Sequence, residues 1–325
     1  MLDRGAPVFP YTGAPCLLPT LHAASTLRMN IGLGQAMALG SAATWAFGVI
    51  LARQLGSTLP PAALNLFKNG LVLAVLTPLA IFSTRGQLPS LTGSQLLLSL
   101  ISGVMGIAVA DTLYFRALNE LGAGRMGVVG NLYSPLVLVL GFLFLDERLG
   151  AWQWLGFALV AMGVLLVARP PRQWQTHPTH TLRGVVIGLV SIALMAVSIV
   201  MLKHVLEAQP LLWITLLRLA GAVTGLLLLA AWPRMRRHFR FVASAVPWPR
   251  LVVAALCGQG LSMVLWLGGY KYAPAAVAAI LNESASVFLV ILGALWLREP
   301  LGKRAVAGVA LTFTGIACML AARPL

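Results

Sequence analysis

Acidic residues are scarce in this sequence. Only 8 of the 325 residues are Asp or Glu, against 23 Lys and Arg, and charged residues make up 10% of the chain. Soluble domains usually carry about 25% charged residues, because water must solvate their surfaces. The hydrophobic fraction is 59% and the mean hydropathy is +0.89. This composition excludes an ordinary soluble protein, and we expect most of the surface to face lipid.

Cysteines are also few, and motifs typical of enzymes are missing. The three cysteines, Cys16, Cys257 and Cys318, lie far apart, and two of them fall inside apolar stretches. This spacing indicates neither a disulfide framework nor a metal site, so we expect no metal and no cofactor. The sequence also lacks His-Glu-x-x-His, Gly-x-Ser-x-Gly and the phosphate-binding Gly-x-x-x-x-Gly-Lys. It therefore predicts neither an enzyme nor an ATP-driven pump.

The formal net charge of +15 raises the question of nucleic-acid binding. The basic residues are scattered through short segments between apolar stretches, rather than grouped with aromatic side chains, which argues against a nucleic-acid partner. Contact with anionic lipid headgroups fits this distribution better. The expected partners are membrane lipids and a small-molecule substrate, and the sequence leaves both a monomer and an oligomer open.

Apolar stretches of about 18 to 24 residues are what the chain has in abundance. At 1.5 Å per residue, a helix of that length crosses a hydrocarbon core of about 30 Å. The first five predicted spans cover 31–52, 62–82, 95–116, 126–145 and 151–168. The second five cover 184–203, 211–232, 251–270, 275–297 and 304–322. We therefore predict an all-α integral membrane protein of ten transmembrane helices, with a polar linker over 169–182.

The segment before the first span, 1–28, contains four prolines and two arginines. None of its apolar stretches is long enough for the core of a signal peptide. We predict a disordered tail. Met29 stands directly before the first span, so an alternative is that translation begins there.

The second half of the chain repeats the first. A shift of 152 residues aligns 134–163 with 286–315 without a gap, and twelve of the thirty positions are identical. The offset is 150 over the first two spans and 155 around the third, where it pairs Gly103 with Gly258. A unit with an odd number of spans enters the membrane from opposite sides in its two copies. The repeats are therefore predicted to be inverted, as in many secondary transporters.

Motifs at equivalent places in both halves resemble the EamA domain. They are ALNELGAGR at 117–125, SP at 134–135 and LDERL at 145–149, then YKYAP at 270–274, LNES at 281–284 and LREPLG at 297–302. Over about 31–322 the chain is similar to the drug/metabolite transporter superfamily. The resemblance implies two pseudo-symmetric EamA repeats, over 31–168 and 183–322. It also implies a central cavity lined by the third, fourth, eighth and ninth helices, with alternating access.

Several proteins of this superfamily export amino acids or other metabolites. The resemblance therefore implies a secondary transporter of the inner membrane that exports amino acids or other small metabolites by alternating access. A lipid or drug flippase or efflux protein is the nearest alternative, and a cavity open sideways to lipid would distinguish it. A non-transporting membrane protein fits less well, because an intramembrane enzyme needs paired catalytic groups at depth.

Charged residues inside predicted spans are the first candidates for a site. Asp111 lies in the third span and Glu283 in the ninth, and a charge at such depth costs about 2.5 to 3.5 kcal/mol. Each carboxyl either exchanges protons or binds substrate in the cavity, or it fixes packing through an interhelical hydrogen bond or ion pair. Lys68 and Arg218 are repeat equivalents. Each either pairs with a carboxylate or binds an anionic group of the substrate.

Uncharged polar and aromatic residues add weaker candidates. Asn131 is the repeat equivalent of Glu283, so a polar group faces the same place in both halves. The other candidates are Asn282, Tyr133, Gln259, Trp45, Ser134 and Ser286. Each is equally explained by hydrogen bonding between helices or by packing. Glu147 and Glu299 lie in turns, where we expect each to cap the N-terminus of the next helix.

Two lines of reasoning predict opposite orientations of the chain in the membrane. Ten spans place both termini on one side, which carries seven Lys and Arg, against fourteen on the other side, with Lys68 and Arg218 left out as buried. The positive-inside rule then places the termini outside. The family resemblance implies cytoplasmic termini.

Overall fold

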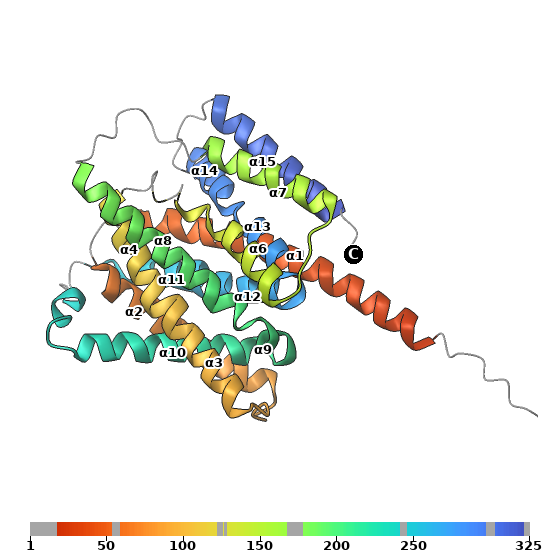
Figure 1. The fold of residues 1–325 in the computed structure, drawn as a ribbon. Helices are drawn as coiled ribbons and strands as arrows, with labels where there is room; N and C mark the ends of the chain where they lie inside the picture. Colours follow the sequence, from red (N-terminus) through yellow and green to blue (C-terminus); the bar gives the residue numbers. More distant parts are fainter. Residues whose placement is uncertain are drawn as a thin grey trace, which may run out of the picture.

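The computed structural model describes residues 18–53, 59–121, 126, 129–167, 178–240, 246–296 and 303–321. Within these ranges the fold consists of helices and connecting turns, without strands (Figure 1). Six helices are long and apolar enough to cross a membrane: Gly32–Leu51, Ala62–Ser83, Gly93–Ala117, Leu182–Val200, Leu211–Ala231 and Trp248–Tyr272. Four shorter apolar helices are Tyr133–Phe144, Ala151–Leu166, Ala275–Leu289 and Val306–Cys318. The predicted all-helical membrane fold is confirmed, and the shorter helices fall on the remaining four predicted spans.

The first half of the chain forms five apolar segments. Its elements are α1 (Leu18–Arg53), α2 (Pro61–Ser83), α3 (Gly93–Gly103), η1 (Val104–Val109), α4 (Ala110–Leu121), α6 (Tyr133–Phe144) and α7 (Ala151–Val167). α2 begins with proline, whose fixed φ suits the first helical position. Thr92 and Gln95 form a capping box at the start of α3. α3, η1 and α4 together make the third segment.

The second half repeats this order. Its elements are α8 (Pro178–Val200), α9 (Lys203–Ala208), α10 (Leu211–Ala231), η2 (Arg236–Phe239), α11 (Trp248–Ala255), η4 (Leu256–Leu261), α12 (Ser262–Tyr272), α13 (Ala275–Asn282), α14 (Ala285–Trp296) and α15 (Lys303–Ala321). α11, η4 and α12 form one continuous segment, which corresponds to the third segment of the first half.

The start of α1 differs from the sequence-based expectation. α1 begins at Leu18, inside the stretch 1–28 for which the sequence predicts disorder. The four prolines of that stretch all lie at or before Pro19, in the first turn of the helix or ahead of it, where proline does not break a helix. Residues 1–17 lie outside the described residues. Helix formation from Leu18 onward therefore corrects part of the predicted tail.

Matching π-helical turns interrupt the third segment of each half. The turns are η1, Val104–Val109, and η4, Leu256–Leu261, which are 152 residues apart. The offset of 155 that pairs Gly103 with Gly258 is therefore wrong, because the structure pairs this region at 152. Isolated glycine matches misplaced the register in a glycine-rich segment. π turns are rare and are frequent at functional sites.

The fourth and ninth segments are broken at equivalent places. In the first half, a turn at Asn131 and Leu132 precedes α6. In the second half, a turn at Glu283 and Ser284 separates α13 from α14. These turns are again 152 residues apart. The first turn of a helix leaves backbone N–H groups without an intrahelical partner, and such groups attract acceptors.

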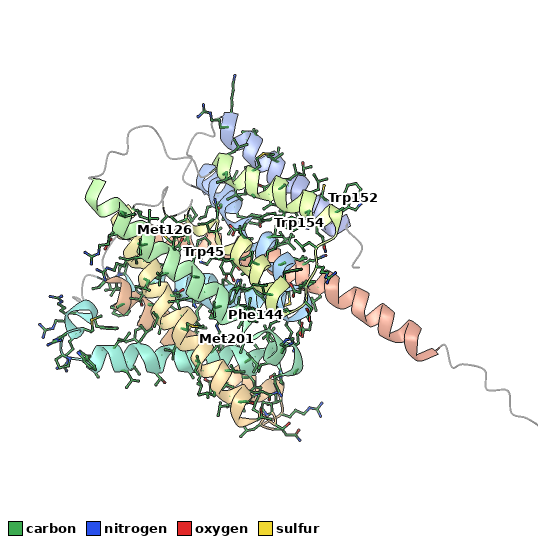
Figure 2. The ribbon with its side chains drawn as sticks, viewed as in Figure 1. Trp45, Met126, Phe144, Trp152, Trp154 and Met201 are labelled. Atoms are coloured by element: carbon green, nitrogen blue, oxygen red, sulfur yellow. The ribbon has the colours of Figure 1, made fainter. Side chains whose placement is uncertain are left out.

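Small residues join α7 to α15 in a close helix pair along one edge of the bundle (Figure 1). A methyl group on Gly163 would lie 2.6 Å from the carbonyl oxygen of Gly308, and one on Gly315 would lie 2.8 Å from that of Gly156. Trp152 and Trp154, also on α7, are both exposed (Figure 2). Glycines let helix backbones approach closely in lipid.

Replacing Gly163 with alanine is expected to destabilise this helix pair, because the new methyl group would collide with the backbone of α15. Overpacking of this kind usually costs about 1–3 kcal/mol. The measurement is thermal unfolding of the detergent-purified protein. Gly70→Ala is the matched control, since nothing lies within 4 Å of a methyl group at Gly70. Equal unfolding temperatures for the two variants would contradict the close packing of α7 against α15.

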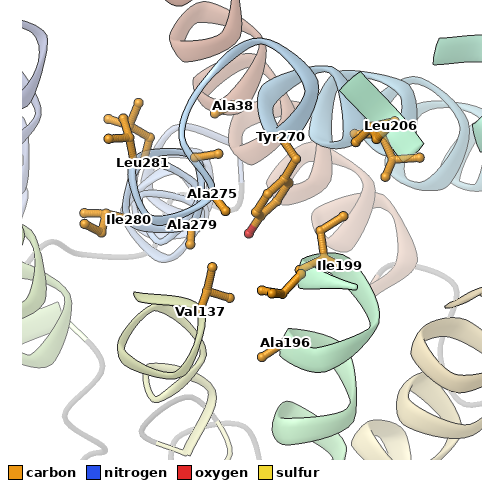
Figure 3. Packing of buried hydrophobic residues seen from close by; sticks show 14 of the residues in the cluster. Ala38, Val137, Ala196, Ile199, Leu206, Tyr270, Ala275, Ala279, Ile280 and Leu281 are labelled. Atoms are coloured by element: carbon orange, nitrogen blue, oxygen red, sulfur yellow. The ribbon is translucent and has the colours of Figure 1, made fainter. Parts of the chain in front are cut away.

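The largest buried apolar cluster lies where the two halves meet. Its members come from α1, α6, α7, α8, α12, α13, α14 and α15, among others. Figure 3 shows the ring of Tyr270 among Val137 of α6, Ile199 of α8, and Ala275 and Ala279 of α13. The polar groups described next are set into and beside this apolar interior.

Candidate functional site

Lys68 and Asp111 form an ion pair between α2 and α4. Lys68 Nζ lies 3.2 Å from Asp111 Oδ2, and the two side chains are 16% and 15% exposed. The Lys68 ammonium also lies 5.2 Å from the centre of the Phe115 ring. The structure therefore brings together two of the predicted site residues. For this pair it favours the ion-pair alternative over two independent charges.

Amide side chains extend this polar region toward the second half. Asn65 Nδ2 donates to the carbonyl oxygen of Ile107, within the π turn η1, at 3.0 Å. Asn69 Nδ2 donates to Asn65 Oδ1 at 2.8 Å, and Gln259 Nε2 donates to Asn69 Oδ1 at 2.8 Å. Gln259 lies in the π turn η4. A chain of hydrogen bonds thus connects the two π turns through α2.

Glu283 bridges the two broken segments. Its Oε1 accepts hydrogen bonds from the Ser134 backbone N–H at 3.3 Å and from Ser134 Oγ at 2.8 Å. The Ser134 N–H belongs to the first turn of α6, where helical N–H groups have no intrahelical partner. A carboxylate at a helix N-terminus is electrostatically favourable. Glu283 therefore connects the break of one half to the break of the other.

A pair of tyrosine hydroxyls forms a second contact between the halves. Tyr133 Oη and Tyr270 Oη lie 2.7 Å apart, joining α6 to α12. The end of α12 is held by Lys203, whose Nζ donates to the carbonyl oxygens of Tyr270 and Ala273 at 2.5 and 2.9 Å. Tyr133 directly precedes Ser134, so the tyrosine pair and the Glu283 contact involve adjacent residues of α6.

Arg218 is the most deeply buried cation of the group, at 2% exposure. Its Nη2 donates to Ser198 Oγ at 3.0 Å, and its Cζ lies 5.1 Å from the centre of the Trp266 ring. Trp266 in turn packs edge-on against Tyr270, with ring centres 5.0 Å apart. These contacts place Arg218 beside the tyrosine pair.

The remaining predicted residues occupy less central positions. Asn131 Nδ2 is buried and has no hydrogen-bond partner among the described residues. No side-chain hydrogen bond links Asn282 or Ser286 to the groups above within the described part of the chain. Trp45 is 38% exposed. The structure thus brings Lys68 to Asp111, Tyr133 to Tyr270 and Ser134 to Glu283, and leaves Trp45 on the exposed side of α1.

Six participants were missed by the sequence reasoning: Asn65, Asn69, Ser198, Lys203, Trp266 and Tyr270. Asn65 and Asn69 are four residues apart in an apolar span, and this spacing puts both amides on one helix face. That signal was available in the sequence. Ser198 and Trp266 carried none, because lone serines and tryptophans are common in membrane helices.

Glu147 caps a helix, but a different one from that expected. Its Oε1 and Oε2 accept hydrogen bonds from the N–H groups of Ala275 and Ala276, at 2.6 and 3.0 Å, at the start of α13. The following helix in sequence is α7, so the expected partner was wrong. α6 and α13 each take a carboxylate from the other half. Glu299 lies outside the described residues.

Replacing Glu147 with alanine is expected to destabilise the fold by about 0.5–2 kcal/mol, the usual cost of a lost helix cap. The proposed cause is the loss of two N–H partners at the start of α13. Thermal unfolding in detergent measures it, with the exposed, neighbouring Arg148→Ala as the control. If the two variants unfold at the same temperature, the cap does not contribute measurably.

Taken with the apolar helices, these buried polar contacts define the chain as a multi-pass membrane protein. The model of the EamA-like transporter family matches residues 32–169 and again 182–321. The chain belongs to the EamA-like transporter family, part of the drug/metabolite transporter superfamily, with two copies of the EamA repeat. The family resemblance found in the motifs is thereby confirmed.

Two curated relatives are similar to parts of this chain. "Uncharacterized transporter YwfM" of Bacillus subtilis (strain 168) is 30% identical over 153 residues, which are 47% of this chain and 50% of the relative. "Uncharacterized transporter in cobO 3'region" of Sinorhizobium sp is 32% identical over 105 residues, or 32% of this chain and 74% of the relative. The match thus spans half the length of the first relative.

A solved structure has the same fold. It is described only as the crystal structure of a protein, and it aligns with a TM-score of 0.72 at 18% identity. The alignment covers 89% of this chain and 96% of that chain. At this identity the likeness establishes the fold alone.

Proposed function

We propose that this protein is a secondary transporter of the inner membrane that exports amino acids or other small metabolites by alternating access. In this proposal ten helices span the membrane, and the repeats over 31–168 and 183–322 have inverted orientations. The substrate binds between the repeats. The names of both curated relatives contain the word transporter, which supports the general class.

The contact between Ser134 and Glu283 is the observation that carries the proposal. It connects the breaks of the fourth and ninth segments, one from each repeat. Broken helices in transporters place backbone groups and polar side chains at the substrate site. Because the contact consists of hydrogen bonds rather than tight apolar packing, we expect it to open and close as the two repeats rock.

The polar groups divide between two roles in this proposal. Lys68 and Asp111 neutralise each other and hold α2 against α4. Glu283, which has no cation within ion-pair distance among the described residues, is the group that exchanges a proton. Tyr133 and Tyr270 close the path between the repeats. Asn131 and Gln259 offer hydrogen bonds to substrate or to the neighbouring amides.

Purified protein reconstituted into liposomes tests the proposal. Radiolabelled amino acids and organic acids are applied as a panel, with an imposed pH gradient, and liposomes without protein serve as the control. We expect protein-dependent flux of at least one compound, saturating with its concentration. The proposed function would be contradicted if the protein is folded and inserted but increases the flux of no compound in the panel.

A further inference from the structure

Arg218 carries more hydrogen-bond donors than the protein satisfies. Its Nε and Nη1 are buried and have no hydrogen-bond partner within the described residues, although Nη2 is bonded to Ser198. Guanidinium groups have five N–H donors and stay charged. Buried polar groups are nearly always hydrogen-bonded, and an exception calls for an explanation. A buried, incompletely paired cation is costly in the membrane and usually marks a functional position.

Comparison of the two repeats shows which partner is missing. Arg218 is the repeat equivalent of Lys68, which is paired with Asp111 at 3.2 Å. At the offset of 152 set by the π turns, the equivalent of Asp111 is Met263. Met263 packs against an apolar cluster that includes Leu219, the neighbour of Arg218. The second repeat has therefore kept the cation and lost the carboxylate.

The backbone around Arg218 leaves room for its guanidinium group. A methyl group on Gly106, in the π turn η1, would lie 2.7 Å from Arg218 Nη2 and would overlap Ser198 Oγ. Glycine at this position thus lets the guanidinium rest against bare backbone. The Trp266 ring also lies beside the group, with its centre 5.1 Å from Arg218 Cζ. These contacts fix the guanidinium in a narrow space, with two of its nitrogens still unpaired.

Surrounding charges do not supply the missing partner. Asp111 attracts the Arg218 cation, but it already forms its ion pair with Lys68. The two tyrosine hydroxyls bond to each other. A small anion that lies beside Arg218 and reaches the tyrosine pair would supply the missing hydrogen-bond acceptor.

We propose that Arg218 binds the carboxylate group of the transported substrate, which takes the place that Asp111 occupies beside Lys68. The proposal rests on the proposed transport function and specifies its substrate class as small organic carboxylates, amino acids included. Guanidinium matches a carboxylate in charge and in planar, forked geometry, so the two form strong charge-assisted hydrogen bonds. Trp266, Tyr133 and Tyr270 then contact the rest of the molecule.

Ligand-dependent thermal stability tests this binding without requiring transport. The probes are matched pairs of an acid and its amide: acetate and acetamide, succinate and succinamide, alanine and alaninamide. Purified wild-type protein in detergent is expected to unfold about 2–4 °C higher with at least one carboxylate at about ten times its Kd. The corresponding amide is expected to leave the unfolding temperature unchanged. Arg218→Gln should remain folded, because it removes an incompletely paired charge, and should lose this response.

Two further variants separate ligand binding from a structural role. Met263→Asp supplies the carboxylate that the second repeat lacks, and it is expected to raise the unfolding temperature without ligand while abolishing the response to carboxylates. Gly106→Ala should weaken the response at least tenfold by displacing the guanidinium, whereas Gly70→Ala should not. Equal stabilisation by acids and amides, or a full response in Arg218→Gln, would overturn the assignment. Flux without any carboxylate response would overturn it too, and would leave the transport function standing.

Discussion

Replacing Glu283 with glutamine is expected to abolish the pH dependence of transport and to lower proton-driven flux on the order of tenfold or more. Glutamine keeps the size of the side chain, and its amide oxygen still accepts from Ser134, so the connection between the two broken segments is preserved. What is lost is the ability to bind and release a proton. Uptake into liposomes at several pH values, with and without a pH gradient, measures the effect.

Ser134→Ala is the matched control for that experiment. It removes the hydroxyl that donates to Glu283 at 2.8 Å but retains the carboxyl group. We expect this variant to keep a pH-dependent flux, with its midpoint moved. A Glu283→Gln protein whose flux follows pH as the wild type does would mean that Glu283 serves packing only, and that another group carries the proton.

Breaking the ion pair of Lys68 is expected to have the largest effect on stability. Lys68→Met leaves the carboxylate of Asp111 about 15% exposed and without its cation. Removing one partner of a buried pair costs about 3–5 kcal/mol, and the remaining exposure should reduce that cost somewhat. Thermal unfolding and the yield of monodisperse protein in detergent are the measurements.

The double variant Lys68→Met, Asp111→Asn isolates the cause. It removes both charges and leaves an amide that can hydrogen-bond, so we expect it to recover most of the lost stability. If the double variant is as unstable as Lys68→Met, the stem of the lysine and its contact with Phe115 matter more than the charge. The ion pair would then lose its assigned structural role.

Much of the fold was predictable, because it depends on patterns that are visible in the sequence. Apolar stretches of spanning length predicted the helices, and the identities at offset 152 predicted the duplication. Comparison of the two repeats also placed Asn131 and Glu283 at equivalent positions, and the structure has a helix break at each of them. These features depend on periodicity and order, which a single sequence contains.

Side-chain partners were harder to predict, because they depend on how each helix is rotated against its neighbours. Nothing in the sequence showed that Lys68 faces Asp111 while Arg218 faces Ser198 and Trp266. Glu147 was expected to cap the next helix in sequence, but it caps α13 of the other half. That choice is set by tertiary packing, which brings α13 closer to the carboxylate than its own neighbour.

The accessibility of position 134 from each side of the membrane tests alternating access most directly. Ser134 is 1% exposed and lies at the contact between the repeats. Ser134→Cys is made in a protein whose Cys16, Cys257 and Cys318 are replaced by serine, and membrane-impermeant thiol reagents are added to one side of sealed liposomes at a time. We predict modification from both sides in separate samples, with substrate changing the two rates in opposite directions. Modification from one side only, whatever the substrate, would contradict the account.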